Sequence, residues 1–135
     1  MSATTIDRTR TRDGFLRLAM RADAAISGLV GLAGIPLAGR LADLSGTTIA
    51  FEYGMAAFLI AYGVVVFGLA SLPSVLRAGM GVIIANLLYT AAAVVLVLAD
   101  AFPLTPAGVV LNLAAGMGTL VFAELQYNGW RRAKA

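Results

Sequence analysis

The chain contains no cysteine and no histidine among its 135 residues. Disulfides, thiolate nucleophiles, Cys/His zinc sites and the usual axial ligand of a b-type haem are therefore excluded. A Ser-His-Asp or Cys-His catalytic arrangement would lack its imidazole base. The single lysine, Lys134, lies outside the apolar runs, so no membrane-buried amine can form a Schiff base. We expect no catalytic residues, no cofactor, no metal site and hence no enzyme.

Charge is also scarce. Only 13% of the residues are charged and 60% are hydrophobic, with a mean hydropathy of +0.88. An ordinary soluble domain has about 25% charged and about 45–50% apolar residues. A soluble fold of this size would still expose roughly a third of its unfolded surface, so it could not hide so many apolar side chains. The composition predicts a small integral membrane protein rather than a soluble enzyme, a disordered tail or a disulfide scaffold.

Charged residues divide the chain into four apolar runs, at 24–39, 53–76, 78–99 and 101–123. At about 1.5 Å per residue, the last three exceed the ~30 Å hydrocarbon thickness. The first run is slightly short and becomes long enough if Arg40 extends towards the headgroups. We predict an all-α, four-transmembrane-helix bundle with spans at about 22–43, 49–71, 76–99 and 106–128.

Short polar connections join these spans. Thr105 before Pro106 predicts a helix N-cap, and Ser74 could cap the third helix in the same way. We expect the first helix to begin near Asp13 and Pro36 to kink it. The predicted organisation is a mobile basic tail at 1–12, a membrane domain at 13–130 and a basic tail at 131–135.

Nine of the ten basic residues fall on one side of the four predicted spans, and only Arg40 falls on the other. The positive-inside rule then places both termini in the cytoplasm. An excess of arginine over lysine, with abundant Ala, Gly and Val, is typical of a GC-rich bacterial genome. We therefore expect a bacterial inner (cell) membrane protein in contact with the lipid bilayer. No basic patch alternates with aromatics, so we expect no nucleic-acid partner.

A weak internal repeat relates Leu41-Ala42-Asp43 to Leu98-Ala99-Asp100, 57 residues later, and Thr48 to Thr105. Parallel repeats of this kind occur in transporters. The repeat predicts two helical hairpins in parallel orientation. Chance similarity in an Ala- and Leu-rich sequence is the alternative.

Lipid tails are as apolar as leucine, so small residues and interhelical hydrogen bonds must hold the helices together. Six residues are the candidates for helix packing and polar contacts: Gly28, Gly31, Gly34, Asn86, Asn112 and Gly116. Counted from the nearest helix ends, the two asparagines lie about 13 Å and 10 Å inside the membrane. We expect them to form a mutual amide hydrogen bond near the midplane. The alternative is a polar contact for a ligand or a partner helix.

Three carboxylates near the predicted interfaces are candidates for ion pairs or a proton site. Asp23 lies at the start of the first span beside Arg21, and Glu124 lies at the same end of the fourth. Both could pair with nearby arginines, or the two could share one proton. Glu52 is in the first turn of the second helix, where the helix dipole favours an acid. It could also pair with Arg40 across the outer hairpin.

Several short patterns are spread along most of the chain. They are Leu18-x-x-Arg21-x-Asp23-Ala24, Gly28-x-x-Gly31, Leu41-x-Asp43, Asn86 and Phe122-x-x-Leu125-Gln126. Together they resemble small four-span bacterial membrane proteins common in actinobacteria. This resemblance implies a structural class and no mechanism.

The absence of catalytic groups beside abundant small-residue faces predicts a non-enzymatic multi-pass membrane protein. We expect an accessory or scaffolding subunit of a larger membrane complex, or a homo-oligomer, that docks through its glycine face or its asparagines. The alternative is a small proton-coupled transporter, or a bundle that binds lipid or a hydrophobic or cationic solute.

Overall fold

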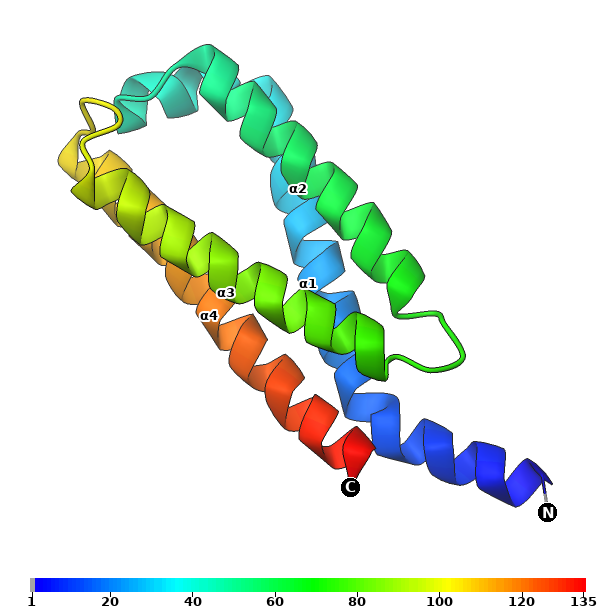
Figure 1. Ribbon diagram of the computed structural model, residues 1–135. Helices are drawn as coiled ribbons and strands as arrows, with labels where there is room; N and C mark the ends of the chain where they lie inside the picture. The colour runs from blue at the N-terminus through cyan, green and yellow to red at the C-terminus, as the bar shows by residue number, and fades with distance from the viewer. Residues whose placement is uncertain (1) are drawn as a thin grey trace.

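The computed structural model describes the backbone of residues 2–135 and the side chains of residues 12–135. The described chain forms four helices, α1 (Ser2–Ser45), α2 (Ile49–Leu69), α3 (Leu76–Leu98) and α4 (Pro106–Lys134). Each contains a segment long and apolar enough to cross a membrane, and residues 2–135 contain no strand. The predicted all-α, four-transmembrane-helix bundle is therefore confirmed (Figure 1).

Helix α1 begins at Ser2, earlier than the start near Asp13 that the sequence indicated. The side chains of residues 1–11 lie outside the described part, so a mobile basic tail remains a prediction. Pro36 lies inside α1 without ending it. Figure 1 shows the last turns of α1 leaning towards the start of α4, where Thr105 N donates to Ser45 O at 3.0 Å.

Threonine caps define the starts of two helices. Thr48 Oγ1 accepts from Phe51 N at 3.1 Å, and Thr105 Oγ1 accepts from Gly108 N at 3.0 Å, with proline following the second cap. The predicted cap at Thr105 is confirmed, but the one at Ser74 is wrong. The buried Val75 occupies the N-cap position of α3 and makes no side-chain cap hydrogen bond, so the exposed Ser74 lies one residue too early.

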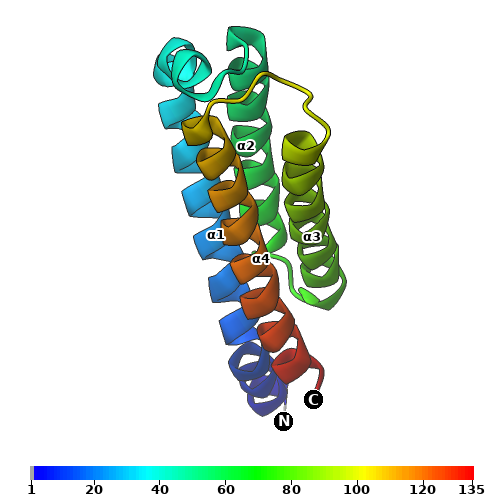
Figure 2. The ribbon, with the colours of Figure 1, turned by 90° about the vertical axis from the view of Figure 1, so that its left-hand side faces the viewer.

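The helices do not form a symmetric bundle. Helix α1 packs along both α2 and α4, and α3 packs along α4, whereas α2 and α3 scarcely touch. Figures 1 and 2 show α1 and α4 side by side, and Figure 1 shows α2 and α3 spreading apart from their connection at 70–75. A parallel repeat of two hairpins would make the α1–α4 and α2–α3 seams equivalent. Helices α1 and α2 pack as one hairpin and α3 and α4 as another, as the repeat predicts. Between the hairpins, however, α1 packs along α4 whereas α2 does not pack along α3.

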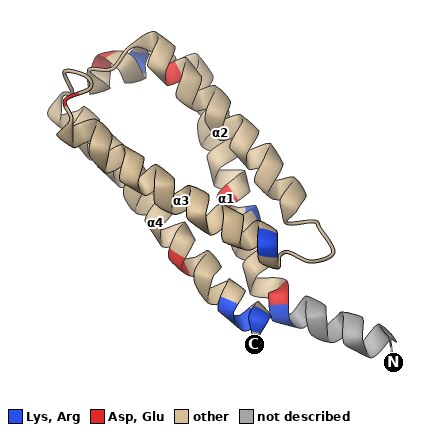
Figure 3. Ribbon diagram, in the orientation of Figure 1, with Lys and Arg blue, Asp and Glu red and all other residues tan. Residues whose placement is uncertain are grey.

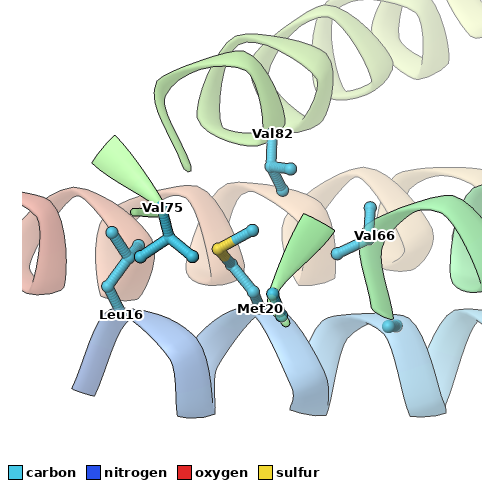
Figure 4. Close-up of a cluster of buried hydrophobic side chains, with 7 residues drawn as sticks. Leu16, Met20, Val66, Val75 and Val82 are labelled. Atoms are coloured by element: carbon cyan, nitrogen blue, oxygen red, sulfur yellow. The ribbon is translucent and has the colours of Figure 1, made fainter. Parts of the chain in front are cut away.

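The ends of the bundle differ in charge and packing. Figure 1 marks both ends of the chain at one end of the bundle, which we call the arginine end. Arg77 lies in the first turn of α3 and Arg131, Arg132 and Lys134 in the last turn of α4, where Figure 3 shows blue segments. Arg40 and Asp43, near the end of α1, and Asp100, just after α3, mark the other, distal end. The arginine end also holds a core of seven buried side chains, most of them labelled in Figure 4: Leu16, Met20, Ala24, Val66, Ala70, Val75 and Val82.

Large apolar side chains remain exposed along the outside of every helix, for example Leu29, Val64, Leu88 and Met117. In water such a surface would drive aggregation, whereas hydrocarbon solvates it. These faces indicate contact with a lipid bilayer. Which end faces the cytoplasm remains a prediction from the arginine distribution.

Candidate functional site

Asp23 lies at the centre of a hydrogen-bond cluster to which every helix contributes. Its side chain is only 2% exposed. Oδ2 accepts from Tyr62 Oη on α2 at 2.8 Å, from Asn86 Nδ2 on α3 at 2.8 Å and from Gln126 Nε2 on α4 at 2.9 Å. Oδ1 accepts from Ser27 Oγ, one turn further along α1, at 3.2 Å. We call these five residues the Asp23 cluster.

Tyr62, Asn86, Gln126 and Ser27 all donate to the Asp23 carboxyl oxygens, which act as acceptors. Asn86 Nδ2 also donates to Gln126 Oε1 at 2.9 Å, and both amide side chains are buried. The two amide N–H groups occupy directions from which a cation would approach Oδ2. The arrangement therefore joins four helices and is poorly suited to holding a metal ion.

Sequence reasoning singled out Asp23 and Asn86 but did not give Ser27, Tyr62 or Gln126 a role here. Gln126 is the only glutamine in the chain. The signal in the sequence was partial, because Ser27 and Asn86 lie on the arginine side of the middle of their apolar runs, whereas Tyr62 does not and Gln126 lies beyond its run. Such groups are costly to expose to lipid and therefore find one another.

The expected amide pair between Asn86 and Asn112 is wrong. Asn112 Nδ2 donates to Gly108 O of its own helix at 2.8 Å. The α3–α4 register explains the error, because Thr90 Oγ1 lies 3.0 Å from Gly116 O and Asn86 is level with Gln126. Asn112 is thus several turns nearer the distal end than Asn86.

The proposed pair of Asp23 and Glu124 is also wrong. Gln126 faces the bundle interior, and Glu124, two residues earlier, is exposed because that spacing turns a side chain about 200° around a helix. Arg21 is exposed as well and has no salt bridge to Asp23. Because Leu16 and Met20, before Asp23, are buried in the core, Asp23 lies inside the bundle rather than at its edge.

Glu52 and Arg40 do not pair either. Glu52 Oε1 accepts from Thr47 Oγ1 at 2.6 Å, which is the nearer partner in the same connection. Arg40 is exposed on α1. Within residues 12–135, the one salt bridge joins Asp13 to Arg17, at 3.0 Å.

Arg17 closes the arginine end. Its guanidinium donates to Asp13 Oδ2 at 3.0 Å and to three backbone carbonyls at the end of α2, those of Ala70 (2.9 Å), Leu72 (2.6 Å) and Pro73 (2.9 Å). A cation is favourable at a helix C-terminus, where carbonyl groups lack intrahelical partners. Arg17 therefore fixes the α2–α3 connection to α1.

The small residues lie at close backbone contacts. A Cβ atom on Gly31 would lie 2.7 Å from Ala56 O, and one on Gly34 would lie 3.3 Å from Ala56 Cβ. Opposite Gly28, a Cβ on Gly63 would lie 3.1 Å from the Gly28 Cα. On the α3–α4 seam, a Cβ on Gly116 would lie 3.1 Å from Ala93 Cβ.

The distal half of the bundle contains a cavity of about 160 Å³, which we call the distal cavity. All four helices contribute to its lining. The polar groups are Ser45, Glu52, Tyr89 and Asn112, and the rest of the lining is apolar, including Met55, Leu59, Leu111 and Ala115. The predicted residues Glu52 and Asn112 therefore come together here.

A row of aromatic rings connects the Asp23 cluster to the distal cavity. Phe58 on α2 stacks on Tyr62 of the cluster, with ring centroids 6.1 Å apart. On α3, Tyr89, which lines the cavity, stacks on the same Phe58 at 6.4 Å. Phe58 thus bridges α2 and α3 where these helices are otherwise separated.

Comparison of the chain with protein-family models, with curated proteins and with solved structures finds no match.

Proposed function

We propose that the protein is a non-enzymatic membrane protein that binds a small solute in the distal cavity. The observation that carries this proposal is the cavity itself, with Glu52, Tyr89 and Asn112 set in an otherwise mostly apolar lining. Ligand sites in proteins are typically concave and apolar, with a few placed polar groups. Packing supports the proposal too, because α2 and α3 make few contacts with each other and Tyr89 is the α3 residue that lines the cavity.

The cavity volume limits the solute. A cavity of about 150 Å³ in another protein is large enough for benzene. The 160 Å³ of the distal cavity can therefore hold a group of about that size. A longer solute would have to extend from the cavity towards the lipid.

Binding is better supported than proton-coupled transport. The sequence hypothesis for transport used Asp23 and Glu124 together, and these residues are separated. Asp23 already has a partner on every helix. We therefore assign Asp23 to the bundle and the solute to the distal cavity.

Single-cysteine labelling tests the proposal, and the native chain is already free of cysteine. Ala115→Cys places a thiol in the cavity lining, and Ala114→Cys is the matched control because both residues are exposed but Ala114 is outside the lining. Thiols react as thiolates, which require water. In proteoliposomes, N-ethylmaleimide should modify Ala115→Cys faster than Ala114→Cys, and hexanol, hexylamine or hexyl sulfate should slow it. Equal rates, or no protection by any probe, would contradict the proposal.

A second candidate function is the accessory subunit, and one observation favours it. An apolar groove of about 540 Å³ follows the α1–α2 seam. Its lining includes Ala24, Ala25, Gly28 and Gly63, the small residues that allow a further helix to approach closely. Ala25→Trp would fill the groove. A partner recovered in mild detergent should then be lost, while Ala92→Trp on the exposed face of α3 should retain it.

A further inference from the structure

We infer that the distal cavity binds the ammonium group of a cationic amphiphile, with the head beside Glu52 and Tyr89 and the alkyl tail passing between α2 and α3 into the lipid. This inference rests on the proposed function and names the solute class. The occupant is an alkylammonium without a phosphate group.

The charge of the lining requires a cation. Glu52 is the only charged residue that lines the distal cavity. Its described partner is the neutral hydroxyl of Thr47, and Arg40 makes no salt bridge with it. Glu52 is half-buried, and a carboxylate at such a position attracts a cation and repels an anion. For the same reason a phosphate-bearing headgroup is disfavoured, because no basic side chain lines the cavity.

Aromatic faces favour an ammonium over a strongly hydrated metal ion. Phe51 and Tyr89 both line the cavity. Each ring is held by a neighbour, Phe51 by Phe102 at 4.8 Å and Tyr89 by Phe58 at 6.4 Å. Aromatic faces attract organic ammonium groups by cation–π interactions, most effectively where water is excluded. Met55 and Leu59 add apolar surface for alkyl substituents.

The open seam provides a route for the tail. The cavity holds only a group about as large as benzene. A six-carbon chain attached to an ammonium head must therefore leave it. Helices α2 and α3 make few contacts with each other, and the contact that a tail passing between them would have to displace is that of Phe58 with Tyr89. Phe58 lies at this seam and can move aside, because half of its surface is exposed.

Calorimetric titration of the full chain in dodecyl maltoside tests the inference. The probes share a six-carbon tail: hexyltrimethylammonium, hexanol and hexyl sulfate. Dihexanoylphosphatidylcholine is added as a lipid source of the same ammonium group. We expect hexyltrimethylammonium to bind most tightly and Glu52→Gln to weaken it about tenfold or more. Glutamine keeps an oxygen for Thr47, so the fold should be retained. Glu124→Gln, the same substitution at an exposed site, should bind like the native chain.

The outcomes separate this inference from the proposed function. Equal affinity of hexanol and hexyltrimethylammonium, both lost in Ala115→Phe, would overturn the cationic class and leave a solute-binding cavity. Native affinity in Glu52→Gln, or tighter binding of the phosphatidylcholine, would also overturn the inference. Absence of binding by every probe, with equal labelling of Ala114→Cys and Ala115→Cys, would overturn both proposals.

Discussion

In the half of the bundle nearest the arginine end, every helix gives a side chain to Asp23, and α2, α3 and their connection meet around Val66, Val75 and Val82. In the distal half, α1 and α2 touch at Gly31, and residues of all four helices line a cavity. Close backbone contacts at glycines also occur near the arginine end, where Gly129 lies against Leu16, so the halves differ in the convergence of polar side chains on one acceptor and in the cavity.

Hydrogen bonds can hold one half of a small membrane protein together while the other half keeps a cavity. Apolar side chains lose little by facing lipid instead of one another, so hydrophobicity does not close the bundle. Hydrogen bonds and close backbone contacts must do so. Near the arginine end, polar side chains from four helices hydrogen-bond to one another and the helices are in contact. In the distal half, polar side chains line a cavity and the helices leave space between them.

The largest effect should come from Asp23→Ala. This change leaves Tyr62, Asn86 and Gln126 without their common acceptor inside a nearly dry site. We expect the free energy of unfolding to fall by about 2–4 kcal/mol, since each buried group left without a partner costs about 1–3 kcal/mol and intramembrane bonds are at the weak end. Titration with dodecyl sulfate in mixed micelles, followed by circular dichroism, measures it.

Asp43→Ala is the matched control, because Asp43 is exposed at the distal end of α1. It should change stability by less than about 0.5 kcal/mol. Equal stability of the two variants would mean that the Asp23 cluster does not stabilise the helix contacts at the arginine end. The two halves would then not differ in the way described above.

The sequence was sufficient for the helices but not for their contacts. Apolar runs, the Thr105–Pro106 start and the one-sided arginines predicted four spans and their approximate limits. The depth of each polar side chain in the membrane was predicted by counting residues from the nearest end of its helix. That count assumes that neighbouring helices begin and end at the same level. Helix α4 begins at Pro106 but continues to Lys134, well beyond its apolar run, so residues at equal counted depth, such as Asn86 and Asn112, do not meet.

The Asp23 cluster was missed for a related reason. Asp23 directly precedes an uncharged run and therefore looked like a residue at the membrane edge. The helix was expected to begin near Asp13, but its residues before Asp23 are packed: Leu16 and Met20 are buried in the core of the arginine end, which places Asp23 inside the bundle. Tyr62 gave no signal of its own, because a tyrosine in an apolar run is also typical of a lipid-facing or core position. The donors to Asp23 can be identified only when the register between the helices is known.

The next largest effect should come from Gly31→Ala, which tests how the distal half is held. The added Cβ would lie 2.7 Å from the backbone oxygen of Ala56, so α1 and α2 must separate. Overpacking of this kind costs about 1–3 kcal/mol. Gly39→Ala is the control, since a Cβ there meets nothing within 4 Å. It should be neutral or slightly stabilising, because alanine favours a helix over glycine. Equal stability of the two variants would contradict glycine packing as the contact of this half.

A smaller effect is expected from Arg17→Gln, which removes the charge that holds the α2–α3 connection. Hydrogen bonds to a charged group contribute more than neutral ones, but this guanidinium is partly exposed, so we expect a loss of about 1–2 kcal/mol. Hydrogen exchange should increase at residues 70–73 and remain unchanged near the distal cavity. Arg21→Gln, an exposed position on the same helix, should leave both unchanged. Faster exchange throughout the bundle would mean that the two halves do not unfold independently.

The smallest effect should distinguish the two asparagines, which the sequence treated as a pair. Asn112 donates only to a carbonyl of its own helix and faces the distal cavity, so Asn112→Ala should cost less than about 0.5 kcal/mol. Asn86 donates to both Asp23 and Gln126, so Asn86→Ala should cost about 1–2 kcal/mol in the same titration. The double variant should equal the sum of the two, because residues without shared partners are additive. A coupling energy above about 0.5 kcal/mol would show that the asparagines contact each other after all, and that the two halves are not separate.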